Sequence, residues 1–447
     1  MTSRSLVPML CFLVIAFSAS ASAQTEPPQG LPQPQSSQGP PVQSLTLQDA
    51  EKIAIQNHPQ IQAAMNLATV AEEQVKQQRS AYYPAAVGNI TGVDAQNNSR
   101  ITAGALNSPH VFGKYGNGLQ VNQLITDFGR THELVKSSNL HAQAEQERVV
   151  TTREDVLLNV DQSYFAVLKA QTLLRVAQAT VKERQLVANQ ISVEAKNQLK
   201  SGLDVSFAQV DLQQAQLLLI QAENDLQASF AQLSTALGYS DQRTFQLAEQ
   251  PLPNEPPPDW PQLIQQAMRD RPELISQRFD VSSAQNYATA ERDLWFPTLS
   301  AAGVAGLTPV REDGLDTTRY AAAGFNLQIP LFNGHLFGAL RNEANAEARA
   351  QQQYLRNLQN NITRDVRTAW LQANSGYQRL SVTQQLLEQA QKALNLATAR
   401  YKLGLSSIVE LTQAQLNETQ AEIAQASAKY DYQTEMAVLN YEIGTVH

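Results

Sequence analysis

The chain has 447 residues, of which 17% are charged, and its formal net charge at pH 7 is -8. This length suffices for one large core or for several small domains. An acidic chain without a run of Lys or Arg lacks the clustered cations that phosphate contacts need, so nucleic-acid binding is excluded.

Residues 1–23 have the pattern of a secretory signal peptide. Arg4 precedes an apolar core, and the small residues Ala21-Ser22-Ala23 precede an expected cleavage before Gln24. A transmembrane anchor is the alternative, but this core is shorter than the roughly 20 apolar residues that a spanning helix needs. The pattern therefore predicts an exported chain.

Cys11, the only cysteine, lies within this signal. The mature chain is therefore expected to have no disulfide and no cysteine-ligated metal. No later stretch approaches the apolar length of a membrane-spanning helix. If the mature chain meets a membrane, we expect it to do so as a β-barrel or at the surface.

Two Pro-rich segments divide the chain. Residues 24–43 consist mainly of Pro, Gln, Gly and Ser, which favours a disordered lead-in because they cannot bury a core. A shorter segment of this kind at 249–259 is interpreted as a linker. It separates a first repeat, 44–248, from a second, 260–447.

The two halves show the features of an internal duplication. Pro59 and Pro84 are 25 residues apart, as are Pro272 and Pro297, and two aromatic residues precede the second proline in each half. Further downstream we match Gly202-Leu203 with Gly404-Leu405, and the ends Leu237-Gly238 with Ile443-Gly444.

Each half contains two stretches rich in Gly, Asn, Thr and Val with short alternating runs. Segments of about ten residues with this pattern are typical of tilted transmembrane β-strands. We expect four strands, at about 85–97, 114–125, 298–308 and 319–331.

The remaining sequence predicts long helices, at about 130–200, 204–238, 334–402 and 406–443. Small or apolar residues recur with a spacing of four and three from Val366 to Tyr401, and a similar series from Val156 to Ala195 includes Arg184. A sustained repeat of this kind imposes a left-handed coiled coil. A helix of about 70 residues is roughly 100 Å long, which no compact globular domain needs.

In this order, these features resemble the TolC-like outer-membrane factors, the outer membrane efflux protein family. The aromatic-Pro pairs before the strands, the turn "LFNGH" at 331–335 and the paired "SGL" and "LGL" breaks carry the resemblance. It implies an α+β membrane protein with long antiparallel coiled-coil hairpins and four transmembrane strands per protomer. A homotrimer would form a 12-stranded barrel and a periplasmic helical tube. Independently, four strands cannot close a conducting barrel, and lipid does not tolerate an open edge.

The resemblance further implies an outer-membrane location, extending into the periplasm, and the function of a passive exit duct for tripartite efflux or type I secretion. Its partners would be a periplasmic adaptor (membrane fusion) protein, an inner-membrane pump of RND, ABC or MFS type, and outer-membrane lipid. The alternative is a soluble periplasmic coiled-coil adaptor or scaffold. An adaptor typically has one helical hairpin between β-domains, whereas two hairpins and two strand pairs are expected here.

Entrance residues are implied by the same resemblance. In the family, the second hairpin tip carries an acidic residue six positions after its glycine and another three positions later. Here these positions hold Glu410 and Gln413, so this half supplies one acid. In the first half Asp211 lies at the second of these places, and Asp204 could serve if the turn is shorter.

The two Gly-Leu breaks have two interpretations. Gly202, Leu203, Gly404 and Leu405 are expected at hairpin tips that dock the adaptor. Alternatively, each Gly takes the left-handed conformation that ends a helix, and each Leu packs back over the last turn.

Aromatic residues beside the strands also have two interpretations. They belong either to a core or to a belt at the interface between barrel and periplasm. The residues concerned are Tyr82, Tyr83, Pro84, Trp295, Phe296, Pro297 and Phe332.

No pattern in the chain indicates catalysis. The six His residues form no ligand spacing such as HExxH, and there is neither a Gly-rich phosphate loop nor a nucleophile elbow. We expect no enzyme activity, no cofactor and no metal. Drug efflux, metal efflux and protein secretion can share one type of duct, so the sequence does not select among these substrates.

Overall fold

The computed structural model describes residues 44–93, 99–101, 108–111, 114–252, 255–308 and 318–445. The signal peptide predicted at 1–23, with Cys11, and the lead-in predicted at 24–43 lie outside the described residues. So do the last positions of the strand predicted at 85–97 and part of the linker predicted at 249–259.

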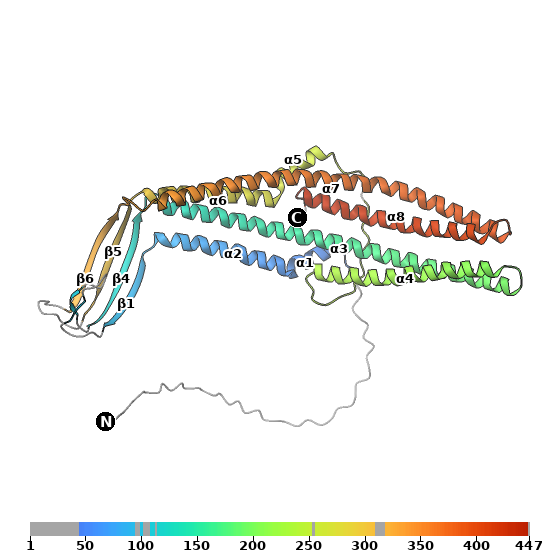
Figure 1. The fold of residues 1–447 in the computed structure, drawn as a ribbon, viewed down its shortest axis with the longest axis horizontal. Helices are drawn as coiled ribbons and strands as arrows, with labels where there is room; N and C mark the ends of the chain where they lie inside the picture. Colours follow the sequence, from blue (N-terminus) through green and yellow to red (C-terminus); the bar gives the residue numbers. More distant parts are fainter. Residues whose placement is uncertain are drawn as a thin grey trace, which may run out of the picture. The chain divides into compact units, whose positions relative to one another are not determined.

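Each half of the chain contains the same series of helices and strands (Figure 1). The first half has α1 (Leu47–Asn57), α2 (Pro59–Arg79), η1 (Ser80–Tyr82), β1 (Ala85–Val93), β4 (Lys114–Thr126), α3 (Arg130–Lys196) and α4 (Gly202–Ala236). The second has α5 (Trp260–Asp270), α6 (Pro272–Arg292), η3 (Asp293–Trp295), β5 (Thr298–Leu307), β6 (Arg319–Gln328), α7 (Leu336–Lys402) and α8 (Ile408–Glu442). Two short strands, β2 (Ser99–Ile101) and β3 (Ser108–Val111), pair with each other and were not expected from the sequence.

Corresponding helices in the two halves have equal lengths. α3 and α7 have 67 residues each, α4 and α8 have 35, α2 and α6 have 21, and α1 and α5 have 11. Pro59 and Pro272 explain one shared boundary, because each holds the preceding residue in an extended conformation and begins the next helix.

The main sheet has four antiparallel strands in the order β1-β4-β5-β6. Central pairs such as Val121↔Gly303 and Ala302↔Gly324 fix the register of its second and third ladders. β1 and β6 are the two edges of this sheet.

The helices nearest the sheet repeat the order of the strands. α2 leads into β1, β4 into α3, α6 into β5, and β6 into α7, while α2 packs on α3, α3 on α6, and α6 on α7 (Figure 1). α2 and α7 are therefore the edges of the helical layer on the same sides as β1 and β6. Among the described residues, no helix combines the length and the apolar character needed to cross a membrane.

At the other end, α3 pairs with α4 and α7 with α8, and α8 also contacts α3 and α4. The predicted series on α7 forms the seam of the second hairpin, since Val366, Ala369, Ala373 and Tyr401 are buried. Gly376 belongs to this seam. A Cβ there would overlap the carboxylate of Glu435 and lie 3.3 Å from Tyr432 Cδ2, both on α8, so glycine allows α7 and α8 to approach closely.

The largest apolar cluster lies midway along the helices and includes Tyr164, Phe165, Phe230 and Tyr430. The hydroxyl of the fully buried Tyr164 lies 2.9 Å from Leu45 O and 2.6 Å from Ala248 O, so these two carbonyls share its single O–H donor. This side chain therefore fixes two distant segments of the chain on α3.

A glycine just after the last helix of each repeat explains the matched endings. Gly238 and Gly444 follow α4 and α8 with φ angles of 84° and 72°, a conformation that favours glycine. A Cβ on Gly238 would lie 2.9 Å from Asn57 O, and one on Gly444 would lie 3.2 Å from Arg271 N. Each glycine thus lets a long helix end directly against the junction of two short ones.

These contacts predict different effects for two glycine substitutions. Gly404 is also left-handed, with φ 72°, but has nothing within 4 Å of an added Cβ. Gly404→Ala should therefore cost only the backbone strain, about 1–2 kcal/mol. Gly238→Ala adds the overlap with Asn57 and should lower the thermal unfolding midpoint of the purified protein more than Gly404→Ala. Equal midpoints for the two variants would contradict the close contact at Gly238.

Candidate functional site

The tip of the first hairpin is the turn that joins α3 to α4. Gln198 takes a left-handed conformation with φ 65°. Its N–H donates to Ala195 O at 2.9 Å, and the N–H of Leu199 donates to Glu194 O at 2.9 Å. This pair of hydrogen bonds satisfies carbonyls at the end of α3 and stops the helix.

α4 begins with a capping box. Ser201 Oγ accepts a hydrogen bond from Asp204 N at 3.2 Å, and Asp204 Oδ2 accepts one from Ser201 N at 3.0 Å. Without these two bonds, the backbone N–H groups of Ser201 and Asp204 would have no partner at the start of the helix. The carboxylate of Asp204 therefore has a local structural role in the turn.

The second tip has the same geometry. Gly404 is left-handed, its N–H donates to Tyr401 O at 3.0 Å, and Leu405 N–H donates to Arg400 O at 2.8 Å. Ser407 then precedes α8 as Ser201 precedes α4.

The predicted match of Gly202-Leu203 with Gly404-Leu405 is therefore wrong by four residues. Gln198-Leu199 occupies the position of Gly404-Leu405, because a Gln instead of a Gly adopts the left-handed conformation at the first tip. Gly202 is the first residue of α4 and is not left-handed. With this correction the counterpart of Glu410 is Asp204, since each is the third residue of its helix.

The leucines at the tips point away from the helices. Leu203 is 65% exposed and Leu405 is 67% exposed, so neither packs back over a helix end as the second interpretation expects. Two further exposed leucines, Leu199 and Leu403, were missed in the sequence. Leu199 and Leu403 lie just before the two Gly-Leu pairs. The 4,3 spacing of apolar residues stops where the helices end, so no pattern marked these two leucines.

Of the predicted entrance residues, Glu410 and Gln413 lie on α8, one turn apart. Glu410 Oε1 is 3.1 Å from Arg400 Nε on α7, and the Glu410 side chain is half exposed. Gln413 Nε2 donates to Asn417 Oδ1 at 2.9 Å along the same helix. Arg400, which the sequence interpretation missed, offsets the charge of Glu410.

Asp211 does not join this pair. It lies on α4, away from the turn, and its Oδ2 is 3.0 Å from Nε of the buried Arg184 on α3. Burial raises the pKa of Asp211 although the Arg184 guanidinium opposes the shift. The three predicted entrance residues are thus divided between two hairpins.

The two tips are held together by a small apolar cluster of Ala188, Ile191, Ala208, Leu212, Tyr401, Ile408 and Leu411. Lys200 Nζ lies 4.0 Å from the centre of the Tyr401 ring, which adds a cation–π contact across the tips. The Tyr401 hydroxyl is buried without a hydrogen-bond partner among the described residues, and burial raises its pKa to about 12. Tyr401 is in the predicted 4,3 series, but the contact with Lys200 depends on how the hairpins meet.

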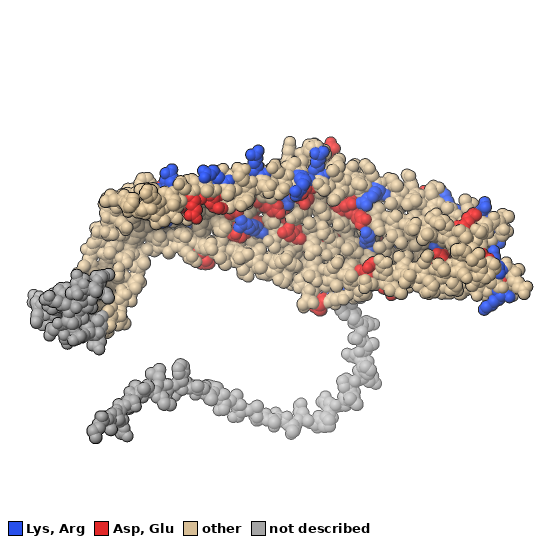
Figure 2. All heavy atoms as spheres, in the orientation of Figure 1, with Lys and Arg blue, Asp and Glu red and all other residues tan. Residues whose placement is uncertain are grey.

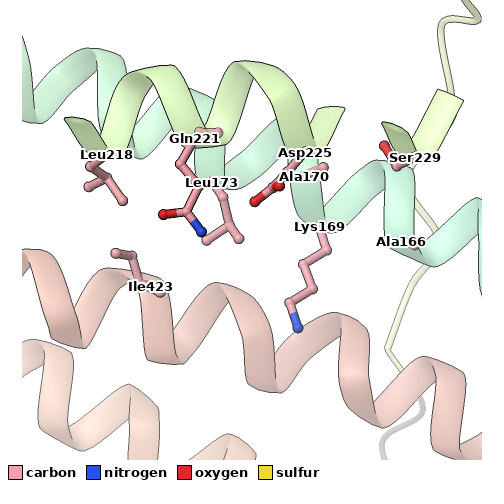
Figure 3. Close-up of a pocket in the computed structure, with 10 residues that line it drawn as sticks. Ala166, Lys169, Ala170, Leu173, Leu218, Gln221, Asp225, Ser229 and Ile423 are labelled. Carbon is pink, nitrogen blue, oxygen red and sulfur yellow. The ribbon is translucent and has the colours of Figure 1, made fainter. Parts of the chain in front are cut away.

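Behind the tips, the space between α3, α4 and α8 contains a cavity of about 370 Å³ (Figure 3). Leu173, Leu218 and Ile423 give it apolar walls. Lys169 extends toward α8 at one end of the cavity and reaches Asp431 Oδ1 at 2.8 Å. At the level of this cavity α8 therefore does not pack directly on the first hairpin.

The aromatic residues beside the strands are exposed. Tyr82, Trp295 and Phe296 are each 47% exposed, so none of them is a core residue. The same holds for Tyr83 and Phe332, while Pro84 is exposed and Pro297 partly so. Trp295 packs edge to face on Phe337 at 5.7 Å between ring centroids. Their assignment to a membrane interface stays a prediction.

No three His, Cys, Asp or Glu residues of the described ranges are placed to hold a metal ion.

Comparisons with known proteins identify the family. The sequence profile described as outer membrane efflux protein matches residues 52–239 and 263–445. The probable outer membrane lipoprotein SilC of Salmonella typhimurium is 25% identical over 68% of this chain and 66% of its own length, slightly under two thirds. The cobalt-zinc-cadmium resistance protein CzcC of Cupriavidus metallidurans is 25% identical over 68% of this chain and 71% of its own.

The fold is that of solved outer-membrane channels. The Campylobacter jejuni CmeC outer membrane channel superposes with a TM-score of 0.79 at 17% identity, over 89% of this chain and 85% of CmeC. The match of both halves to this family contradicts the alternative of a soluble adaptor or scaffold. The chain belongs to the outer membrane efflux protein family and is located in the bacterial outer membrane, from which it extends into the periplasm.

Proposed function

We propose that the chain is one subunit of a homotrimeric exit duct for efflux, which passively conducts substrates from the periplasm to the exterior. The proposal rests on one observation: the sheet and the helical layer have their open edges on the same two sides of the subunit. β1 and α2 end the two layers on one side, and β6 and α7 end them on the other. An unpaired strand edge is not tolerated in lipid.

One rotation can close both layers at once. It would pair β6 with β1 of the next copy and α7 with α2 of the next copy, as in a ring built from heterologous contacts. Three copies of the four strands would give the 12-stranded barrel implied by the resemblance.

The two helical edges have surfaces that a neighbouring copy would cover. α2 exposes Met65, Leu67 and Val70, and α7 exposes Tyr354 and Leu371. In Figure 2, Lys and Arg side chains follow the α7 edge, where Arg349 and Arg356 are exposed. A mixed apolar and charged edge suits a permanent contact with a second copy of the chain.

Engineered cysteines test this assembly. Ala63 on α2 and Gln353 on α7 are exposed, and each lies about 24 Å along its helix from the end that faces the strands. Oxidation of the double variant Ala63→Cys with Gln353→Cys should give covalent dimers and trimers on denaturing gels. The only natural cysteine, Cys11, lies in the predicted signal peptide.

The single-cysteine variants are the matched controls. In a three-fold ring the same residue of two copies is never adjacent at a heterologous contact, so each single variant should remain monomeric after oxidation. Cross-linked species from a single variant, or none from the double variant, would contradict the proposed ring.

We further propose that the hairpin tips form the periplasmic entrance and that Glu410 faces the passage. Its half-exposed carboxylate at the tip supports this role, and Arg400 at 3.1 Å partly offsets its charge. Gln413 contributes no charge, so each subunit supplies a single acid from this hairpin.

Glu410→Gln should therefore weaken the block of single-channel conductance by divalent cations in planar bilayers. Gln413→Glu, which adds a carboxylate one turn along α8, should strengthen the block. If neither substitution changes the conductance or its sensitivity to divalent cations, Glu410 and Gln413 do not face the passage.

The exposed tip leucines are proposed to dock a periplasmic adaptor, which would connect the duct to an inner-membrane pump. Leu203, Leu405 and the unpredicted Leu199 and Leu403 support this because they form apolar ends on both hairpins. The description of the family as outer membrane efflux proteins supports efflux as the process served.

Leu405→Glu should abolish efflux in a complementation assay while the protein still assembles and reaches the outer membrane, because a charge replaces an exposed apolar contact. Gln420→Glu adds the same charge at an exposed position farther along α8 and should complement normally. Normal efflux by the Leu405→Glu variant would show that this leucine does not dock a partner.

A further inference from the structure

A group of ionisable side chains lies where α8 crosses the first hairpin. At its centre is Arg184 of α3, which is 3% exposed and is the only charged residue at a buried position of the predicted series. Its Nε is 3.0 Å from Asp211 Oδ2 on α4, and a terminal nitrogen is 3.2 Å from Thr419 Oγ1 on α8. One guanidinium therefore joins three helices.

Carboxyl groups outnumber this cation. Glu183 Oε1 lies 3.2 Å from Arg184 and accepts a hydrogen bond from Gln415 Nε2 on α8, also at 3.2 Å. Gln415 is 1% exposed, and its Oε1 has no hydrogen-bond partner within the described part of the chain. Burying an acceptor without a hydrogen-bond partner costs free energy, so Gln415 lowers the stability of this part of the interface.

α8 adds two more acids to the same interface. Glu418 is partly buried beside Glu422, one turn along the helix, and also faces Glu183 and Arg184. Two carboxyl groups, Glu183 of α3 and Asp211 of α4, thus contact the guanidinium. Glu418 and Glu422 lie on the face of α8 that also carries Thr419, the third contact of Arg184.

The helix on the other side of α8 does not correct this imbalance. At this level α7 carries Glu388 and Lys392, which pair with each other at 2.6 Å. Lys182, next to Glu183 on α3, is exposed. The net charge of the interface when all groups are ionised is therefore negative.

Two of these carboxyl groups, Glu418 and Asp211, lie in surroundings that favour the protonated form. Burial, with Glu422 and Glu183 nearby, raises the pKa of Glu418 to about 7, and burial raises the pKa of Asp211. A carboxyl group whose pKa is raised by packing stabilises the packed state at low pH. For Glu418 this contribution is lost as the pH rises through about 7.

Apolar packing of α8 on the first hairpin is limited on both sides of this group of charges. Toward the middle of the helices the interface opens into the cavity between α3, α4 and α8 (Figure 3). Toward the tips only the small cluster around Tyr401 remains. Polar groups therefore make up much of the contact between α8 and the first hairpin along this stretch.

We propose that Glu418 of α8, together with Glu183, Arg184 and Asp211 of the first hairpin and Glu422 beside it, forms a pH-sensitive clasp. The clasp joins α8 to the first hairpin when Glu418 is protonated and loosens when Glu418 is ionised. The clasp acts within one subunit. It is independent of whether the tips conduct substrates, so its failure would leave the proposed duct untouched.

Spin labels on the purified, assembled protein test the clasp directly. Gln214 on α4 and Asn417 on α8 are exposed positions next to it, and both would be replaced by labelled cysteines. Labelled chains are diluted with unlabelled ones, so that the measured distances lie within one subunit. The distance distribution should be narrow at pH 5.5 and should broaden to longer distances by pH 8.5, with a midpoint near pH 7.

Glu418→Gln is the decisive variant because it keeps the shape of the side chain and removes its charge. It should retain the narrow distribution at pH 8.5. The matched control Glu388→Gln removes an acid of the exposed pair on α7 and should respond to pH like the unchanged clasp. A distribution that does not change with pH, or a Glu418→Gln variant that still broadens, would overturn the proposal.

Discussion

The structure depends on the short connections between each strand and its helix. Only a few residues separate Arg79 from β1, Thr126 from α3, Arg292 from β5 and Gln328 from α7. Such short connections leave the chain no room to exchange neighbours, so the helices must take the order of the strands. The sheet and the helical layer consequently share their open sides, and a single kind of contact between copies can complete both.

The features that could be predicted from the sequence are those that a pattern within one helix or strand specifies. The 4,3 series on α7 is a local pattern, and its members Val366, Ala373 and Tyr401 are buried as the pattern requires. Helices and strands were therefore predictable, and the family resemblance supplied their assembly into a channel fold. β2 and β3 were not predicted because their strands are too short to produce an alternating pattern.

The site was predicted less well than the fold, since its contacts join distant segments. At the first tip the sequence favours Gly202 as the left-handed residue, yet Gln198 takes that conformation because the hydrogen bonds that close α3 fall there. Asp211 was recognised as an acid near a turn. Its partner Arg184 belongs to another helix, and no local spacing relates the two.

The contacts of α8 with the rest of the subunit change in kind from its C-terminal end toward the tip. Near its C-terminal end α8 contributes Tyr430 to the main apolar cluster, and Gln433 donates to Gln250 O at 3.1 Å from the segment that links the halves. Toward the tip these contacts give way to a cavity, a group of like charges and a small apolar cluster. Segments with few buried apolar contacts open at lower free energy than a core. The free end of the second hairpin is therefore where we expect the lowest free energy of local opening in the subunit.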